Sequence, residues 1–540
     1  MKKSNIPFVG LRAHSVAGSP FDALGYPQDH MDYAYDNGCE ALALTDHGNC
    51  NGLGYQVLHA KKMKEEGKDF KPIFGVEAYF IPSLESWNQE RDRAKNDKKR
   101  ASEIKDSTTM SVENEGETKR SKSILNQRSH LILLAQNQTG LNNIFAMISK
   151  SNSDEYFFRF PRVDYEVLRE HSEGVIASSA CMGGVYAANF WKFWDGENEV
   201  ISDHEACLEA FRETTREMVS IFGDRWYGEL QWHTDKKQHL INELVIQMHK
   251  EFGIKLISTA DSHYPNPDAW KDRELYKRLG FLGKGKPTWL SDELPESVAE
   301  VGYELYPKNG DQMWDSYKHY TQLNGVEYDD DLVMDSITET HNIAFNRIEE
   351  FMPDNEVRLP SFVVPDGYTA DAALETVSLE SLNKLGLLEK PEYKARLVEE
   401  LSVISDRGFS KYFLTMKAIA DTATENQLAG PGRGSAAGSL VAYALGITQV
   451  DPIKYGLQFA RFLRKDATDY PDIDYDVSNP MKLKEIMQEK WGQTTVVPIS
   501  NFNTLQLKSL VKDISKLYDI PFAEANAVTS RMVAEATPKA

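Results

Sequence analysis

Six short apolar runs recur along the first 300 residues, and they constrain the fold more than any other feature. They lie at residues 41–45, 71–80, 129–135, 174–180, 226–232 and 254–260. Stretches with helical periodicity separate them, for example from Gly54 to Glu66. Strands that alternate with helices are typical of βα units. The pattern therefore predicts an α/β domain built around a parallel sheet or a barrel.

One polar segment, from Ser83 to Arg128, interrupts this pattern. It contains ERDRAKNDKKR and SVENEGETKRSKS, and most of its residues are polar. Such a stretch buries too little apolar surface to fold by itself, so we expect a surface insertion that is partly disordered. We interpret its basic run KNDKKR as a solvated loop rather than as a contact to nucleic acid.

Length and composition limit the class of protein. A chain of 540 residues has room for two to four domains. It contains no apolar run long enough to span a membrane and no apolar signal core, and the spacing of its four cysteines fits neither a disulfide framework nor a zinc knuckle. We therefore expect a cytoplasmic protein with reduced thiols and no membrane partner.

The charge is unevenly distributed. The net charge is −21, which disfavours nucleic acid as a partner at first sight. However, the acidic excess lies in residues 1–410, whereas basic and acidic residues are nearly balanced from Lys411 onward. The second part of the chain is thus compatible with DNA, although its charge does not indicate binding.

Residue types that bind metals lie at or near the ends of the apolar runs. Asp46 and His47 follow the first run, and the others are Glu77, His130, Cys181, Asp261 and His263. Residues at the mouth of a βα barrel converge on one site. Histidine, cysteine and carboxylate suit Zn²⁺ or Mn²⁺, and adjacent ions could clamp a phosphoester. A lone histidine at a strand end is more often structural, but the repetition favours a metal site.

A glycine-rich loop, GPGRGSAAGS at 430–439, opens a predicted helix. Its glycines let backbone N–H groups approach an anion, and a helix N-terminus favours negative charge. Arg433 and the hydroxyls of Ser435 and Ser439 could add donors. Such turns are common, so the loop alone is a weak indication of phosphate binding.

Alternating aspartates follow in YPDIDYDV, at Asp472, Asp474 and Asp476. Alternate residues of a strand share a face, so we expect Asp472 and Asp474 to point together. Two adjacent carboxylates repel unless a cation lies between them, and paired Mg²⁺ ions that bridge to a nucleoside triphosphate are the standard use. An exposed acidic edge strand is the alternative.

The front of the chain resembles the PHP domain family over about residues 6–300. The resemblance lies in FVGLRAHS, LALTDHGNCNGL, KPIFGVEAY, SHLILLA, GVIASSAC and DSHY. It implies a (β/α) barrel-like fold and a metal site for phosphoester chemistry. The implied ligands are His14, Asp22, His47, Glu77, His130, Cys181, Asp261 and His263. Arg12 stands where the family has a histidine ligand, which puts one ion in doubt because a guanidinium cannot bind a metal.

The run from GPGRGSAAGS to DIDYD resembles, without a gap, the palm of bacterial C-family replicative DNA polymerases. This resemblance implies an α/β palm of the nucleotidyltransferase, polymerase beta-like type. Gly434, Ser435 and Arg461 would then bind the triphosphate, and Asp472 and Asp474 would be catalytic ligands of Mg²⁺. It continues into SNFNTLQLKSLVKDI, where Lys508 matches the start of a helical thumb.

These resemblances divide the chain into a PHP domain (1–300, with the insertion at 83–128), a palm with a helical lead-in (301–504) and the start of a thumb (505–540). Family members continue further, and their third catalytic aspartate would lie beyond Ala540. We therefore expect a polymerase, acting on DNA primer-template and dNTPs, that needs a second polypeptide and meets other replisome proteins. The alternatives are a free-standing phosphoesterase or 3′-exonuclease and a non-catalytic replisome module.

Overall fold

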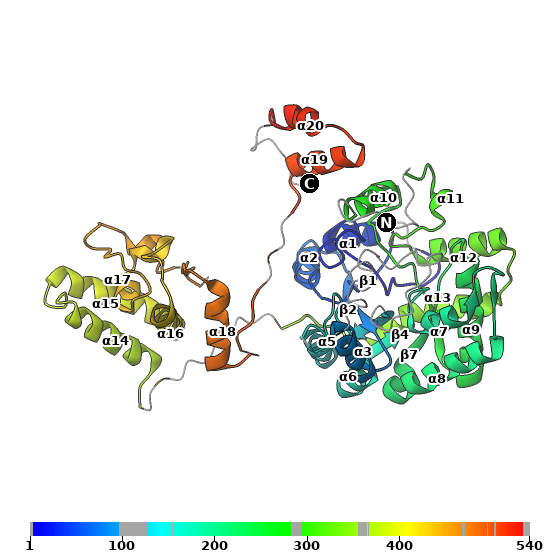
Figure 1. Cartoon of the computed structure of the whole chain (residues 1–540), viewed down its shortest axis with the longest axis horizontal. Helices are drawn as coiled ribbons and strands as arrows, with labels where there is room; N and C mark the ends of the chain where they lie inside the picture. The colour runs from blue at the N-terminus through cyan, green and yellow to red at the C-terminus, as the bar shows by residue number, and fades with distance from the viewer. Residues whose placement is uncertain are drawn as a thin grey trace. The chain divides into compact units, whose positions relative to one another are not determined.

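The computed structural model describes residues 4–96, 127–153, 155–281, 294–354, 364, 367–466, 470–493, 495–499, 501 and 504–532. They form two compact units (Figure 1). The first contains the described residues up to Asp354 and those from Thr504 onward, and the second contains those between. Residues 97–126, which make up most of the predicted insertion, lie outside the described residues. Within the described parts, no helix has the length and apolar character that crossing a membrane requires.

All six predicted strands are present in the first unit, and they form one sheet in the order β1-β2-β3-β4-β7-β8. Only β3 runs against the others, because it pairs antiparallel with both β2 and β4. The strands are β1 (Ala41–Leu44), β2 (Lys71–Phe80), β3 (Ser129–Ala135), β4 (Val175–Ser178), β7 (Trp226–Leu230) and β8 (Lys255–Ser258). The expectation of a parallel sheet is thus confirmed except at β3.

An extended segment near the N-terminus closes this sheet into a barrel. Gly10 pairs parallel with Leu42 of β1, and Ala13 pairs parallel with Ser262, just after β8. The amide of Ala43 donates to the carbonyl of Gly10 at 2.8 Å, and the amide of Ser262 donates to the carbonyl of Arg12 at 3.1 Å. The segment therefore satisfies both edges of the sheet, which confirms the barrel-like α/β fold.

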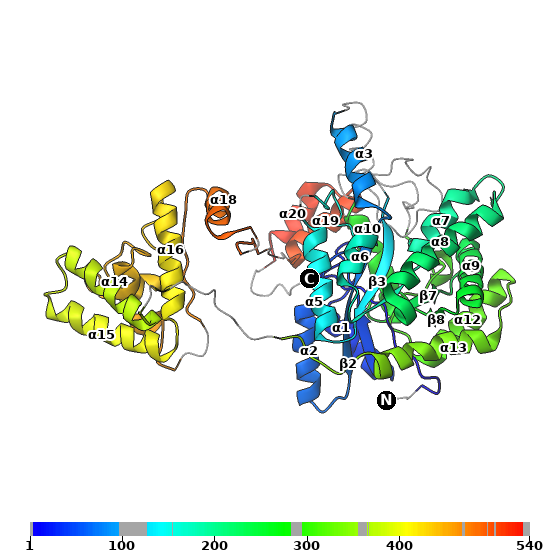
Figure 2. The same cartoon turned by 90° about the horizontal axis from the view of Figure 1, so that it is seen from below.

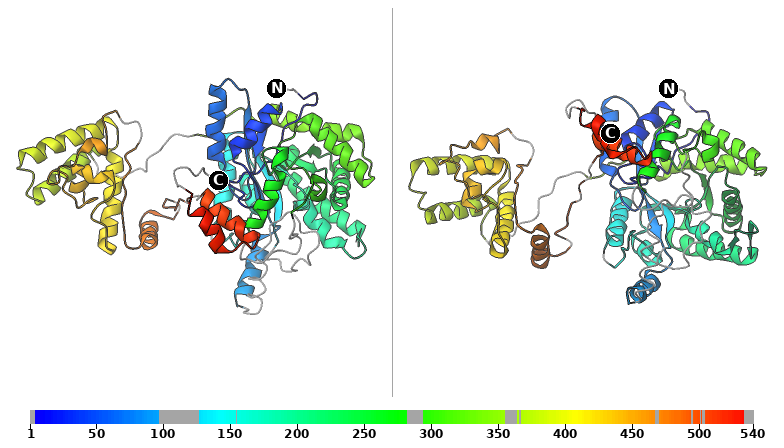
Figure 3. Two further views of the ribbon diagram at one scale, coloured as in Figure 1. Left: turned by 90° about the horizontal axis from the view of Figure 1, so that it is seen from above. Right: turned by 45° about the horizontal axis from the view of Figure 1, so that its top comes forward.

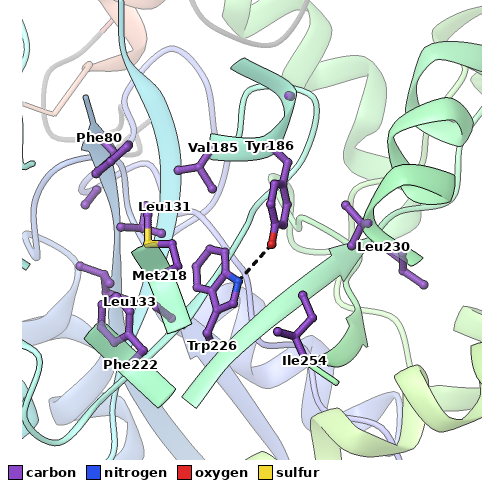
Figure 4. Packing of buried hydrophobic residues seen from close by; sticks show 14 of the residues in the cluster. Phe80, Leu131, Leu133, Val185, Tyr186, Met218, Phe222, Trp226, Leu230 and Ile254 are labelled. Atoms are coloured by element: carbon purple, nitrogen blue, oxygen red, sulfur yellow. Dashed lines mark hydrogen bonds between the residues drawn. The ribbon is translucent and has the colours of Figure 1, made fainter. Parts of the chain in front are cut away.

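Helices surround the barrel (Figures 1 and 2), and their apolar faces form the outer core. In this core Tyr186 stacks on Phe211 and accepts a hydrogen bond from Trp226 Nε1 at 3.2 Å (Figure 4). The helices are α1 (Pro27–Asp36), α2 (Leu53–Glu65), α5 (Gln138–Ser151), α6 (Tyr165–His171), α7 (Val185–Phe193), α8 (His204–Phe222), α9 (Lys236–Phe252), α10 (Trp270–Leu279), α11 (Val298–Val301), α12 (Gly310–Asn324) and α13 (Asp330–Asn342). A short hairpin, β5 (Trp194–Asp195) and β6 (Val200–Ile201), follows α7.

The barrel interior has its own apolar core, which separates the two ends of the barrel. Ile73, Ile132 and Ile257 from three strands meet Ile343 and Ala344 of the π-helical turn η5 (Ile343–Arg347). The first unit thus includes α12, α13 and η5, which lie beyond the boundary at residue 300 that the sequence predicts. The predicted metal ligands lie at the opposite end of the barrel from this apolar contact with η5.

The beginning of the predicted insertion is a helix, α3 (Leu84–Asn96), which projects from the first unit (Figure 2). Leu84 and Trp87, one turn apart, are both buried, and the amide of Leu84 donates to Asp164 at 2.9 Å. The prediction of a partly disordered surface insertion did not foresee this helix, which the buried Leu84 and Trp87 anchor to the core.

The second unit is built from helices around its own apolar core (Figures 1 and 3). Its elements are α14 (Ala370–Lys384), α15 (Pro391–Asp406), α16 (Ser410–Asn426), η6 (Ser435–Gly438), α17 (Leu440–Ala444), η7 (Phe459–Arg461) and α18 (Pro480–Trp491). Its described residues contain no strand, and a single bridge pairs Ala429 with Val477. The expected strand at YPDIDYDV is therefore an extended segment instead, since no described strand offers it a hydrogen-bonding partner.

Two further helices, α19 (Leu507–Leu517) and α20 (Phe522–Thr529), pack against each other. They occupy the part of the chain for which a helical thumb is predicted. Lys508 lies in the first turn of α19 and is half-buried. The helical character of this region thus agrees with the prediction.

Candidate metal centre and phosphate-binding loop

The period-two geometry of the strands carries polar side chains to one end of the barrel. Glu77 follows Ile73 on the inward face of β2, and Asp261 follows Ile257 beyond β8. His130 is the second residue of β3 and shares the face of Ile132. Because β3 is antiparallel, its first residues reach the mouth at which the other strands end. This reversal explains how a residue at a strand's start joins residues at strand ends.

Six predicted ligands form three overlapping groups whose donor atoms lie within 4.8 Å of one another. The groups are His14, His47 and His263; His47, Glu77 and His130; and His14, Glu77 and Asp261. All six side chains are buried or nearly so. The His14 ring lies 4.3 Å from both the His47 and the His263 ring, centroid to centroid.

The remaining predicted ligands, Asp22 and Cys181, border the same cluster. Asp22 Oδ2 lies 2.9 Å from His47 Nε2, and its other oxygen accepts from Arg273 at 3.0 Å. Cys181 Sγ lies 3.5 Å from Arg12 Nη2. The structure thus brings together all eight predicted residues, whose role as metal ligands stays a prediction. Asp46 differs, since its carboxylate accepts from the amide and hydroxyl of Ser15 instead.

A strained backbone conformation positions two of the segments that carry these residues. Asp261 has φ +50° and Ala180, just before Cys181, has φ +57°, a region that non-glycine residues rarely occupy. The turn at Asp261 also brings the carbonyl of that residue within 2.7 Å of His263 Nδ1. Residues held in such conformations cluster at functional sites, where the surroundings compensate for the strain.

Arg12 lies inside the cluster rather than at its edge. Its Nε lies 2.8 Å from Glu77 Oε2 and 3.0 Å from Asp261 Oδ1, and its Nη1 lies 3.2 Å from Glu229 Oε1. The Arg12 side chain is about 1% exposed. Sequence reasoning missed Glu229, although a glutamate inside the apolar run WYGELQW, on the inward face with Tyr227, was a usable signal.

Charge pairing keeps this buried cluster ionised. Burial favours a neutral carboxyl, yet Arg12 and the surrounding histidines hold the pKa of Glu77 well below its ordinary value. Burial opposes the charge of Arg12 as well, but the carboxylates of Asp261, Glu77 and Glu229 raise its pKa well above the ordinary value. Burial raises the pKa of Cys181 to about 12, which keeps a thiol in the absence of a stronger cation.

The donor set fits a divalent metal ion. Among the described residues, His47 Nδ1 and His130 Nε2 are buried and make no hydrogen bond of acceptable geometry. Buried polar atoms are normally paired, so atoms left in this state indicate a ligand. Imidazole and carboxylate together suit Zn²⁺ or Mn²⁺, which supply a Lewis acid and an activated water to a phosphoester.

The second unit brings the glycine loop and the aspartate segment together. The amide of Gly430 donates to the carbonyl of Asp476 at 2.9 Å, and Arg433 pairs with the Asp476 carboxylate at 3.2 Å. Gly434, at φ +65°, approaches Asp474 so closely that a Cβ there would lie 2.4 Å from Asp474 Oδ2. Two motifs that are well separated in the sequence therefore form one surface.

The aspartates share that exposed surface as predicted, although they do not form a strand. Asp472, Asp474 and Asp476 are exposed, whereas Ile473 and Tyr475 between them are half-buried and pack on the apolar core. Gly434, Ser435 and Arg461 are exposed as well. Arg461 ends η7, which lies against η6 beside the loop. The alternation of exposed and half-buried side chains along this segment is thus set by packing on the core rather than by a hydrogen-bonded ladder.

The helix that follows the glycine loop already holds an anion. Buried Glu400 accepts from the amides of Leu440 and Val441 at 2.9 and 3.0 Å and from Ser439 Oγ at 2.8 Å. Arg396 pairs with the same carboxylate at 2.7 Å. Since Glu400 and Ser439 occupy the N-terminus of α17, the predicted role of this terminus and of the Ser439 hydroxyl in phosphate binding is wrong. The exposed loop from Gly432 to Ser435 is what remains for a phosphate.

Comparisons with known proteins agree with both halves of this description. The model of the PHP domain family matches residues 10–233, and that of the bacterial DNA polymerase III alpha NTPase domain matches residues 372–539. The chain is 31% identical to the DNA polymerase III subunit alpha of Borreliella burgdorferi over 97% of its length, and 31% identical to that of Aquifex aeolicus over 96%. That of Thermus aquaticus is 30% identical. The chain spans about two fifths of the length of these curated relatives.

Proposed function

Over the region that it spans, the chain belongs to the bacterial DNA polymerase III alpha family, and from this premise we propose that it supplies part of a DNA polymerase active site. Gly434 and Ser435 hold the triphosphate of a dNTP, Arg461 neutralises it, and Asp472 and Asp474 hold Mg²⁺. The observation that supports the proposal is the close approach of Gly434 to Asp474, because a glycine-rich loop is suited to an anion and a neighbouring carboxylate is suited to Mg²⁺.

The chemistry of the exposed surface supports this assignment. The Gly432–Ser435 loop is exposed and offers backbone amides and the cation of Arg433, while Asp472 and Asp474 offer oxygen ligands of the type that Mg²⁺ prefers. Mg²⁺ supplies charge stabilisation for the triphosphate and activation of a primer hydroxyl. The chain's own contribution is to fix loop and carboxylates in one orientation, which the Gly430–Asp476 hydrogen bond achieves.

We further propose that a second polypeptide completes this active site with a third carboxylate and a pocket for the base. The test is primer extension by this chain alone and after mixing with a chain that carries the remaining family segments. We expect extension only in the mixture, abolished by Asp472→Asn or Asp474→Asn but retained with Asp476→Asn, whose carboxylate pairs with Arg433. Extension by this chain alone would refute the need for a second chain.

The barrel mouth supports a second candidate function, a metal-dependent phosphoesterase or 3′-exonuclease. The buried, incompletely bonded donors around Glu77 are the observation that favours it. The test is release of nucleotides from a 3′-recessed DNA in Mn²⁺, compared with His47→Ala. No release, or equal release by both proteins, would leave the barrel without this activity.

A further inference from the structure

Arg12 occupies one of the three donor groups at the barrel mouth. The group formed by His14, Glu77 and Asp261 converges on Glu77 Oε2 and Asp261 Oδ1, each 3.2 Å from His14 Nε2. Arg12 Nε lies 2.8 and 3.0 Å from the same two oxygens. A guanidinium so placed supplies the positive charge that these buried carboxylates require and leaves no room for an ion among them.

Glu229 holds the guanidinium in this position. It accepts from Arg12 Nη1 at 3.2 Å, from Ser178 at 2.9 Å, from Thr259 at 2.5 Å and from Gln231 at 3.2 Å. With so many donors around it and no exposure, Glu229 has a fixed orientation and faces Arg12. It therefore acts as a built-in counter-charge for an arginine rather than as a metal ligand.

A second donor group faces away from Arg12 and is intact. His47 Nδ1 lies 3.4 Å from Glu77 Oε1, and His130 Nδ1 is in close contact with the same oxygen. Glu77 thus offers one oxygen to Arg12 and the other to this group. His47 Nε2 meets Asp22 Oδ2 at 2.9 Å, and Arg273 fixes Asp22. A ligating histidine commonly donates its other ring N–H to a carboxylate in this way.

We propose that Arg12 takes the place of one divalent ion, that Glu229 holds it there, and that the chain binds a single ion at His47, Glu77 and His130. In this arrangement Asp22 positions His47 and is not a ligand. The third group, His14, His47 and His263, holds no further ion because His47 already serves the first. The inference deepens the second candidate function, yet it concerns metal content and stands even if no phosphoester is cleaved.

The test is the metal content of the full chain after equilibration with Mn²⁺ or Zn²⁺ and gel filtration, measured by mass spectrometry. We expect about one equivalent in the wild type and in Arg12→Lys, which keeps the charge, and about two in Arg12→His. Two or more equivalents in the wild type, or no increase in Arg12→His, would overturn the proposal. Glu229→Gln should keep its single ion, and loss of that ion would make Glu229 a ligand.

Cobalt provides a readout that does not depend on activity. Cys181 contacts Arg12 at 3.5 Å and lies outside the proposed site, so Co²⁺ bound to the wild type should show no thiolate-to-cobalt charge-transfer absorption. In Arg12→His the vacated position reaches Cys181, and the absorption should appear and be lost again in Arg12→His combined with Cys181→Ser. A charge-transfer band in the wild type would contradict the assignment, whatever the fold of the variants.

Discussion

Gly434 and Asp474 lie so close that a methyl group added to Gly434 would force the aspartate side chain to move: a Cβ on Gly434 would be 2.4 Å from Asp474 Oδ2. We expect Gly434→Ala to displace the aspartate and to weaken binding of dATP with Mg²⁺ at least about tenfold, which corresponds to about 1.4 kcal/mol. Gly456→Ala is the matched control, because φ is +66° there and the added Cβ meets open space. Equal binding by both variants would show that the close approach of Gly434 to Asp474 does not contribute to nucleotide binding.

Glu400 determines the stability of the turn between the loop and α17. Glu400→Ala leaves the buried amides of Leu440 and Val441 without their acceptor, so we expect a loss of about 3 kcal/mol in the unfolding free energy of the second unit. Hydrogen exchange of peptides that cover α17 measures this loss. Glu399→Ala, at an exposed neighbour on the same helix, should change exchange by less than about 0.5 kcal/mol. Equal protection in both variants would show that Glu400 is dispensable.

Metal removal should destabilise the first unit. An ion that binds only the folded chain raises its stability, so a chelator should lower the thermal midpoint of the first unit by several degrees, on the order of 2–4 °C per kcal/mol. His47→Ala should lower the midpoint beforehand and make it insensitive to chelator. His59→Ala is the control, since His59 pairs with Asp32 outside the cluster. A midpoint that chelation leaves unchanged would argue against a bound ion.

Because Lys308 is buried, we expect the free energy of unfolding of the first unit to depend on pH. Burial lowers its pKa from the ordinary 10.5 to about 8, although its ammonium donates to the carbonyl of Glu304. Between pH 8 and 10.5 the unfolded chain keeps a proton that the folded chain has released, so stability rises with pH in this window. We expect the wild type to gain about 2 kcal/mol over this range relative to Lys308→Met.

Tryptophan fluorescence during urea unfolding measures this difference, because Trp87 and Trp226 lie in the core of the first unit. Lys250→Met, at an exposed lysine of the same unit, should track the wild type at every pH. A constant difference between the wild type and Lys308→Met from pH 7 to 10 would mean that Lys308 does not titrate in this range.

The strands were predictable because their apolar runs are bounded and buried on both faces, and Lys71–Phe80 and Ser129–Ala135 match the prediction residue for residue. The reversed direction of β3 could not be predicted, because the sequence of a strand does not encode the orientation of its partners. The local pattern around Glu229 and Glu400 likewise gives no sign of their partners. Arg12, Leu440 and Val441 reach these carboxylates only through the tertiary fold.

The exposed face of Asp472 and Asp474 was predictable from alternation alone, because Ile473 and Tyr475 seek the core whether or not a ladder forms. Whether this segment forms a strand could not be predicted, because a hydrogen-bonded ladder needs a partner that no local pattern reveals. The helix within the predicted insertion was missed for a related reason. Composition averages over a segment, whereas the two residues Leu84 and Trp87 determine where α3 is anchored.

The closure of the barrel by Gly10–His14 imposes an order on how the site matures. During synthesis this segment leaves the ribosome long before Ser262, the residue that pairs with its second edge. Until β8 has been made, one edge of this segment has no strand to pair with. Arg12 also lacks its ion-pair partner Asp261. Contacts that are so distant in sequence form late and slow the folding of a domain. A nascent chain stalled before β8 should therefore lack the ion pair between Arg12 and Asp261 and should rely on chaperones to protect its open edge.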